Sequence, residues 1–120
     1  MPKNQDYSVN RVTYQVTKGF RSEFLQACND QNKKPSKLKR NWAINFMETN
    51  DPNGKGLKEF KLQKVEISGD EIINDQVYFP SMELKTRFVE YCDKNSISLG
   101  DFFRTCEYNF IKTGDPTGKI

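Results

Sequence analysis

Apolar and polar side chains alternate in one short stretch near the start of the chain and then recur at helical spacing. Val12-Thr-Tyr-Gln-Val16 alternates strictly, which is typical of a half-buried strand. Thr17 is a suitable cap for a following helix. Apolar residues then recur at i, i+4, i+7 and i+8, as on one face of an amphipathic helix; they are Phe20, Phe24, Ala27 and Cys28. The pattern predicts a strand over 12–16 and a helix that ends at about Asn32.

A second helix is predicted to begin at Pro35, because proline is tolerated in the first turn of a helix. Its expected apolar face consists of Leu38, either Trp42 or Ala43, Phe46 and Met47. Asn50 stands at its predicted end, and Pro52 follows two residues later. Asparagine readily adopts the left-handed conformation past a helix C-terminus, and a proline beyond it prevents continuation. The first part of the chain therefore predicts a strand–helix–helix unit.

The same order of residues recurs 64 positions later without a gap. Identical residues at this offset include Tyr14 and Tyr78, Phe24 and Phe88, Cys28 and Cys92, Arg40 and Arg104, and Phe46 and Phe110. Both copies end in Asp-Pro-x-Gly-Lys, at 51–55 and 115–119. A repeated unit of this kind is one supersecondary element that buries its apolar face against its neighbour.

The second copy predicts a strand near Gln76–Pro80 and two helices capped by Ser81 and Ser98. The first of these helices is expected to bury Leu84, Phe88, Tyr91 and Cys92. The second is expected to bury Leu99, Phe102 or Phe103, Cys106, Phe110 and Ile111. Gly114 follows it in the place that Asn50 holds in the first copy, and glycine is the usual residue there.

Each predicted strand lacks a partner within its own copy, so the other copy must supply one. Pairing 12–16 antiparallel to 76–80 makes a two-stranded ribbon, which needs helices packed on one face to be stable. The predicted fold is therefore mainly α with a two-stranded antiparallel β-ribbon. The expected organisation is a flexible N-terminal arm, a first repeat, a linker whose partial alternation is compatible with a short strand, and a second repeat; the ranges are 1–9, 10–56, 57–73 and 74–120.

Charge is distributed unevenly between the two copies, although the chain of 120 residues has a net charge of only +3. Residues 10–56 carry nine Lys/Arg against four Asp/Glu, a net +5, whereas residues 74–120 carry six against seven, a net −1. This asymmetry predicts that a polyanion contacts mainly the first copy. No apolar run reaches the ~20 residues of a transmembrane helix, and the first residues do not form a signal peptide.

The chemistry-bearing residues favour a binding protein over an enzyme. The chain has three cysteines, no histidine and no Cys-x-x-Cys, so neither a metal site nor a cofactor is predicted. Cys28 and Cys92 occupy the same place on corresponding helices, which favours buried reduced thiols. We therefore expect a cytoplasmic protein with no metal, no cofactor and no membrane association.

The outward face of the first strand carries side chains suited to reading DNA. If Val12, Tyr14 and Val16 face the helices, alternation sends Arg11, Thr13 and Gln15 outward. Arginine hydrogen-bonds guanine, glutamine hydrogen-bonds adenine and threonine contacts either in the major groove. A two-stranded ribbon also fits that groove.

The second strand leaves two registers open. The same alternation sends Asp75, Val77 and Phe79 outward, where Val77 and Phe79 would contact thymine methyl groups. A one-residue shift would instead bury Val77 and Phe79 and expose Gln76 and Tyr78, because such a shift reverses every side chain. The shift would require a bulge near Pro80, and we favour the unshifted register. In both registers the two strands differ, so an asymmetric DNA site is expected.

The paired units resemble the ribbon-helix-helix DNA-binding family of the Arc and MetJ type. The segments that carry the resemblance are Val12-Thr-Tyr-Gln-Val-Thr-x-x-Phe-Arg21 and Lys94-Asn-Ser-Ile-Ser-Leu-Gly-Asp-Phe-Phe-Arg104. The tandem arrangement is similar to that of the TraY family of conjugative relaxosome proteins. This resemblance implies an intramolecular pseudo-dimer that is monomeric without DNA and reads bases with the ribbon.

The resemblance also implies phosphate contacts at the start of the second helix of each copy. In the first copy these positions are Lys33, Lys34, Ser36 and Lys37. Lys39 is expected to contact phosphates together with these lysines. In the second copy they are Ser98, Leu99 and Gly100. Pro35 has no N–H to donate, and Asp101 is unfavourable beside a phosphate.

Two functions are compatible with these features. The first is sequence-specific binding of double-stranded DNA. The protein would then act as a repressor or other transcription regulator, or as a relaxosome or plasmid accessory factor, and would be encoded by a plasmid or phage. Further copies of the chain would bind beside it on the DNA. The alternative is a protein-binding adaptor or inhibitor that uses Val77 and Phe79 as an exposed apolar surface.

Overall fold

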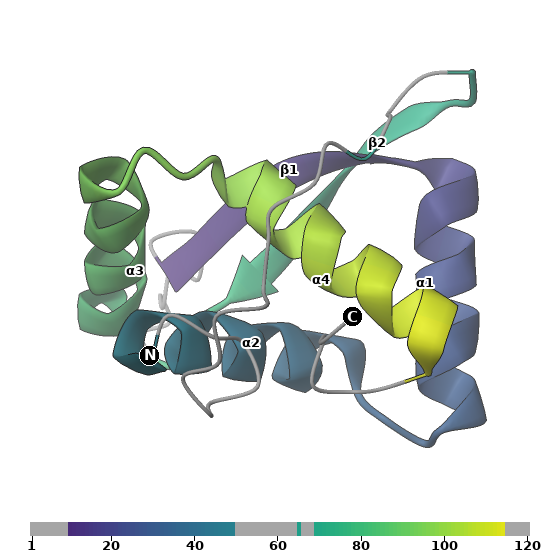
Figure 1. Cartoon of the computed structure of the whole chain (residues 1–120), viewed down its shortest axis with the longest axis horizontal. Coiled ribbons are helices and arrows are strands. Elements are labelled where there is room, and N and C mark those ends of the chain that lie inside the picture. Colours follow the sequence, from purple (N-terminus) through teal and green to yellow (C-terminus); the bar gives the residue numbers. More distant parts are fainter. Residues whose placement is uncertain (1–9, 50–64, 66–68, 115–120) are drawn as a thin grey trace, which may run out of the picture.

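Two strands and four helices follow one another in the part of the chain that the computed structural model describes, residues 10–49, 65 and 69–114. They are β1 (Arg11–Thr17), α1 (Lys18–Asp30), α2 (Pro35–Thr49), β2 (Ile72–Tyr78), α3 (Met82–Lys94) and α4 (Leu99–Thr113). The fold is mainly helical, as predicted (Figure 1).

The two strands form the antiparallel ribbon that the sequence predicts. Arg11 lies opposite Tyr78, and Val16 lies opposite Ile73. The first strand has nearly its predicted bounds. The second begins four residues before the predicted 76–80 and ends at Tyr78, so β2 includes residues that were expected to belong to the linker.

The helices pack on one side of the ribbon and at its two ends. Figure 1 shows α4 crossing in front of the strands, α2 below them, and α1 and α3 at opposite sides. The contacts join elements that are distant in sequence: α1 packs against α4, α2 against α3, α2 against β2, and α4 against β1.

The helix starts and ends follow local chemistry. The hydroxyl oxygens of Thr17 and Ser81 accept hydrogen bonds from the third backbone N–H beyond them at 3.1 Å each, and Ser98 does so at 3.2 Å. These N-caps confirm the prediction. Gly114 ends α4 with a φ of +70° and donates to the carbonyl of Phe110. Asn50 lies outside the described residues.

The two helix–turn–helix connections repeat the same geometry. Asn32 and Ser96, which stand 64 residues apart, both have a φ of +57°. Beyond them, the N–H of Lys33 donates to Cys28 and the N–H of Ile97 donates to Cys92, each at 2.8 Å. A left-handed residue followed by such a hydrogen bond closes a helix C-terminus. The two turns therefore have the same backbone conformation at equivalent positions of the repeat.

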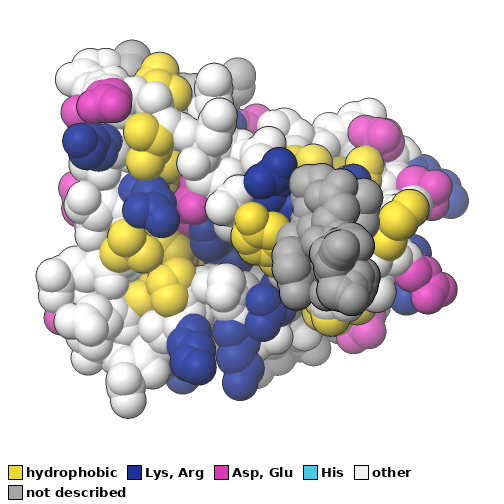
Figure 2. Space-filling model, turned by 180° about the vertical axis from the view of Figure 1, so that it is seen from behind, with side chains coloured by type: hydrophobic (Ala, Val, Ile, Leu, Met, Phe, Trp, Pro, Cys, Tyr) yellow, Lys and Arg dark blue, Asp and Glu magenta, His cyan; other side chains and the backbone are white. Residues whose placement is uncertain are grey.

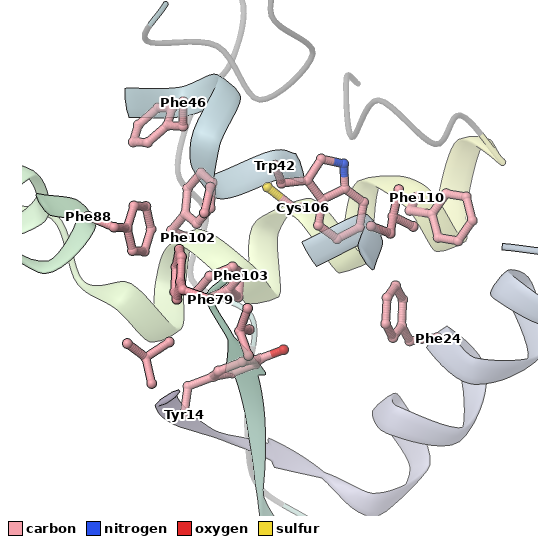
Figure 3. Packing of buried hydrophobic residues seen from close by; sticks show 14 of the residues in the cluster. Tyr14, Phe24, Trp42, Phe46, Phe79, Phe88, Phe102, Phe103, Cys106 and Phe110 are labelled. Carbon is pink, nitrogen blue, oxygen red and sulfur yellow. The ribbon is translucent and has the colours of Figure 1, made fainter. Parts of the chain in front are cut away.

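Aromatic rings that come from different elements fill the core (Figure 3). Phe24 and Phe110 lie with ring centroids 6.0 Å apart, and Trp42 contacts both rings. Phe46 packs on Phe102 at 4.6 Å. Where the sequence left alternatives open, both candidates of each pair are buried: Trp42 with Ala43, and Phe102 with Phe103. The remaining predicted core residues are buried or partly buried against this cluster; they are Phe20, Ala27, Cys28, Leu38, Met47, Leu84, Phe88, Tyr91, Cys92, Leu99, Cys106 and Ile111.

Several expectations concern residues that the structure does not describe. The N-terminal arm 1–9, the linker strand over most of 57–73 and the two Asp-Pro-x-Gly-Lys segments lie outside the described residues.

Candidate nucleic-acid interface

The outer face of the ribbon carries mainly polar side chains from both strands. Thr13 and Gln15 on β1 are exposed and Arg11 is half-buried, as the predicted alternation requires. On β2 the outward polar residues are Asn74, Gln76 and Tyr78, the first two exposed and the third half-buried. The apolar Ile72 at the start of β2 is also outward and is 45% exposed. Opposite pairs across the ribbon are Arg11 with Tyr78, Thr13 with Gln76, and Gln15 with Asn74.

The favoured register of the second strand is wrong. Val77 and Phe79 are only 0% and 3% exposed, and Asp75 is 6% exposed. These three residues face the helices, so Val77 and Phe79 are core residues and do not lie on the outward face. The shifted register, which exposes Gln76 and Tyr78, is the one that the structure adopts.

A buried ion pair explains why an aspartate takes an inward position. The ammonium of Lys39 on α2 lies 3.0 Å from the carboxylate of Asp75 and is itself 3% exposed. Arg21 on α1 approaches the same carboxylate at 3.5 Å. A buried charge is tolerated when it is paired, so Lys39 on α2, together with Arg21 on α1, makes an inward Asp75 possible. Lys39 was expected to join the phosphate-contacting lysines, and its burial makes that expectation wrong.

The connection between β2 and α3 absorbs the shift. In the first copy α1 follows β1 directly, whereas Phe79, Pro80 and Ser81 separate β2 from α3. The N–H of Phe79 still donates to the carbonyl of Asn10 at 2.8 Å. Pro80 has no N–H with which to continue the pairing. The extra residues let α3 keep its 64-residue offset from α1 while the strand faces reverse.

Lys39 also joins a buried network beneath the ribbon. It donates to the Tyr14 hydroxyl at 3.0 Å, and that hydroxyl donates to Glu107 on α4 at 2.7 Å. The Lys39 ammonium lies 3.7 Å from the Glu107 carboxylate. Burial raises the pKa of Glu107 to about 7, against the lowering effects of Lys39 and Tyr14. Burial raises the pKa of Tyr14 well above its ordinary value, and the negative charge of Glu107 raises it further.

The starts of α2 and α4 lie beside opposite strands of the ribbon. Pro35 and Ser36 at the start of α2 line a hollow of about 340 Å³ together with Gln76 and Tyr78 of β2. Arg104 on the first turns of α4 donates to the carbonyl of Gln15 on β1 at 2.6 Å and to Asp101 at 2.9 Å. Each second helix therefore begins next to an edge of the polar face.

The predicted phosphate-contacting residues of the first copy lie together and are exposed. Lys33, Lys34 and Lys37 line one hollow of about 430 Å³, which Asn32, Leu38 and Asn41 complete. Ser36 is exposed on the same turn. Figure 2 shows Lys and Arg side chains gathered at the lower centre of the rear face, at the height of α2 in Figure 1.

The corresponding residues of the second copy form a different surface. Ser98 is exposed, and Leu99 and Gly100 are half-buried. A Cβ on Gly100 would lie 2.8 Å from the Arg104 guanidinium, so the absence of a side chain lets this arginine lie against the helix start. The Asp101 carboxylate accepts from Arg104 and is thereby partly neutralised.

Sequence reasoning missed Asn74 and placed Gln76 and Tyr78 outward only in the register it did not favour. The signal was the alternation Ile73, Asp75, Val77 and Phe79, in which three of four inward residues are apolar. Because Asp75 is charged, it was expected to point outward, and this inward alternation was missed. The partner that neutralises this charge is 36 positions away in sequence.

Other kinds of site receive no support within residues 10–49, 65 and 69–114. No group of three or more metal-ligating side chains forms in this part of the chain, and none of its helices is long and apolar enough to cross a membrane. The three cysteines are buried and form no disulfide bond with one another. Burial raises the pKa of Cys28 to about 11 and that of Cys92 to about 12, so both thiols stay protonated.

Comparisons with protein-family models, with curated proteins and with solved structures find no match.

Proposed function

We propose that this chain is a tandem ribbon-helix-helix protein that binds double-stranded DNA sequence-specifically through its ribbon. In this proposal the two copies form an intramolecular pseudo-dimer, monomeric in the absence of DNA. Its role is that of a transcription regulator or of an accessory factor of a relaxosome.

The packing of the helices supports the pseudo-dimer. Both helices of the second half begin 64 residues after their counterparts: α3 at Met82 corresponds to α1 at Lys18, and α4 at Leu99 corresponds to α2 at Pro35. Exchanging the copies converts the α1–α4 contact into the α3–α2 contact, and the α4–β1 contact into the α2–β2 contact. Such an exchange is what a two-fold relation between the copies requires.

The polar outer face of the ribbon is the observation that carries the DNA-binding proposal. Six side chains on it can hydrogen-bond base edges, while the opposite face is buried against helices. A two-stranded ribbon that presents such side chains is a known way of entering the major groove. The helix starts beside it, with Ser36, Lys33, Lys34 and Lys37 at α2, suit phosphate contact.

The protein-binding alternative loses its motivation. It depended on Val77 and Phe79 as exposed apolar anchors, and both side chains are buried. The polar residues that replace them on the outer face favour a polar partner. DNA is consequently the ligand that we propose.

Binding of a random duplex pool at increasing salt tests this proposal. If the chain neutralises roughly four to six phosphates, log K should fall against log salt with a slope of about −4 to −5. Lys34→Ala should weaken binding to all duplexes alike and reduce the slope by about 1. Lys112→Ala, at the opposite end of α4 from its N-terminus, is the matched control and should change neither quantity. Salt-independent binding, or no binding to any duplex, would contradict the proposal.

A further inference from the structure

The two ends of the ribbon's outer face differ in chemistry. At one end Gln15 lies opposite Asn74, and both side chains are exposed carboxamides. At the other end Arg11 lies opposite Tyr78. The face is therefore polarised along the strands, although its middle, Thr13 opposite Gln76, is neutral.

A hydrogen bond across the strands defines the arginine end. The Nη1 of Arg11 donates to Oε1 of Gln76 at 3.3 Å. Gln76 lies diagonally across the ribbon from Arg11, two residues before Tyr78 on β2. A guanidinium has only donors, so the carbonyl oxygen of Gln76 must be the group that faces it. This contact uses the acceptor of Gln76 and leaves its amide N–H groups and the other guanidinium N–H groups for a ligand. The Arg11–Gln76 end thus presents donors.

The carboxamide end presents donors and acceptors together. Gln15 and Asn74 each carry one carbonyl oxygen and one NH₂ group. In the major groove guanine offers two acceptors, N7 and O6, whereas adenine offers the acceptor N7 beside the donor N6. The donor end is complementary to guanine, and the carboxamide end is complementary to adenine.

The distance between the two ends sets the spacing of these bases. Arg11 and Gln15 are four residues apart on one strand, and an antiparallel strand rises about 3.4 Å per residue. Stacked base pairs are also about 3.4 Å apart. The two ends are therefore about 14 Å apart, which corresponds to about three to four base pairs, because the groove runs obliquely to the duplex axis along which the 3.4 Å spacing is measured.

We infer that the chain reads a non-palindromic DNA site in which a guanine, contacted by Arg11 and Gln76, lies about three to four base pairs from an adenine contacted by Gln15 and Asn74. This inference rests on the proposed function, because it specifies the ligand of the same ribbon face.

Selection from a random 20-base-pair duplex library with the full chain tests the inference. The wild type should enrich an asymmetric site with the two preferences at the stated spacing. Arg11→Ala should relax the guanine preference roughly 5- to 150-fold and leave the adenine preference intact, while Gln15→Ala should do the reverse. The matched controls Arg87→Ala on α3 and Gln26→Ala on α1 replace the same residue types at exposed positions outside the ribbon and should leave both preferences unchanged.

The possible failures separate the inference from the proposed function. A palindromic selected site, a site without these two preferences, or relaxation of one and the same base pair by both ribbon variants would overturn the inference and leave DNA binding standing. No enrichment of any duplex by the wild type, with the chain folded by circular dichroism, would overturn the proposed function and the inference together.

Discussion

At the scale of single residues, one lysine decides which way a strand faces. Lys39 lies between two buried carboxylates, those of Asp75 and Glu107. Burial of the Glu107 carboxylate outweighs its pairing with Lys39, so the cluster favours a proton on Glu107. The positions 64 residues from Lys39 and Glu107 are Phe103 and Ala43, so exchanging the two copies does not reproduce this cluster.

Replacing Glu107 should change how stability depends on pH. The pKa of Glu107 is raised by burial from 4.5 to about 7 in the folded chain. A raised pKa means that its contribution to stability is fully present below about pH 4.5 and is lost as pH rises through 7. Glu107→Gln cannot titrate, so between pH 4.5 and 7 the wild type should lose on the order of 3 kcal/mol more than the variant.

Urea unfolding followed by circular dichroism at several pH values measures this difference. Glu23→Gln, an exposed substitution on α1, is the control and should follow the wild type throughout. Parallel pH profiles of the wild type and Glu107→Gln would show that Glu107 is already ionised at low pH and would contradict the prediction.

At the scale of elements, the repeat preserves backbone geometry more faithfully than side chains. Asn32 and Ser96 share the left-handed conformation at the two interhelical turns, with a φ of +57° each. Asparagine tolerates this conformation better than most residues, whereas serine has no comparable preference. The same turn is therefore built with different strain in the two copies.

Glycine substitutions at these two turns should have unequal effects. Ser96→Gly should stabilise the protein by about 0.5–1 kcal/mol, because glycine adopts a positive φ without a steric penalty. Asn32→Gly should change stability less, since the asparagine is already accommodated. Thermal unfolding of both variants beside the wild type measures the difference. Equal shifts in Tm, or a loss at Ser96, would be incompatible with this account.

At the scale of the whole molecule, the two halves of the chain contribute to one common core. Phe24 packs against Phe110, and Phe46 packs against Phe102. The ribbon itself takes one strand from each half. Lys39 finds both of its buried carboxylates in the second half of the chain. The apolar surfaces of the two halves are thus buried against each other.

Separating the halves should abolish folding, and mixing them should restore it. Fragments 1–57 and 58–120 are each expected to lack near-ultraviolet circular dichroism and cooperative unfolding, because each half would lose the strand and the rings that the other half supplies, and a domain of about 60 residues is marginal even with a complete core. An equimolar mixture should regain both signals and sediment as a one-to-one complex. The intact chain serves as the reference. A fragment that unfolds cooperatively by itself would contradict the shared core.

The sequence by itself determined the order of the elements, the N-caps of three helices and most of the core. These features depend on local periodicity and on residues within one turn of each other, as with Thr17 at the start of α1 and Gly114 at the end of α4. The outward positions of Thr13 and Gln15 followed from the alternation of β1 in the same way.

Only the tertiary structure decided the face of β2 and, with it, half of the candidate interface. In an alternating strand a charged residue is expected to face solvent. Because Asp75 was placed outward for this reason, the register predicted for the second strand was wrong. Its burial depends on Lys39, which a separate helix brings within 3.0 Å. A pairing of buried charges over such a separation is a property of the folded chain, because the free energy of burying either charge is acceptable only when both are present.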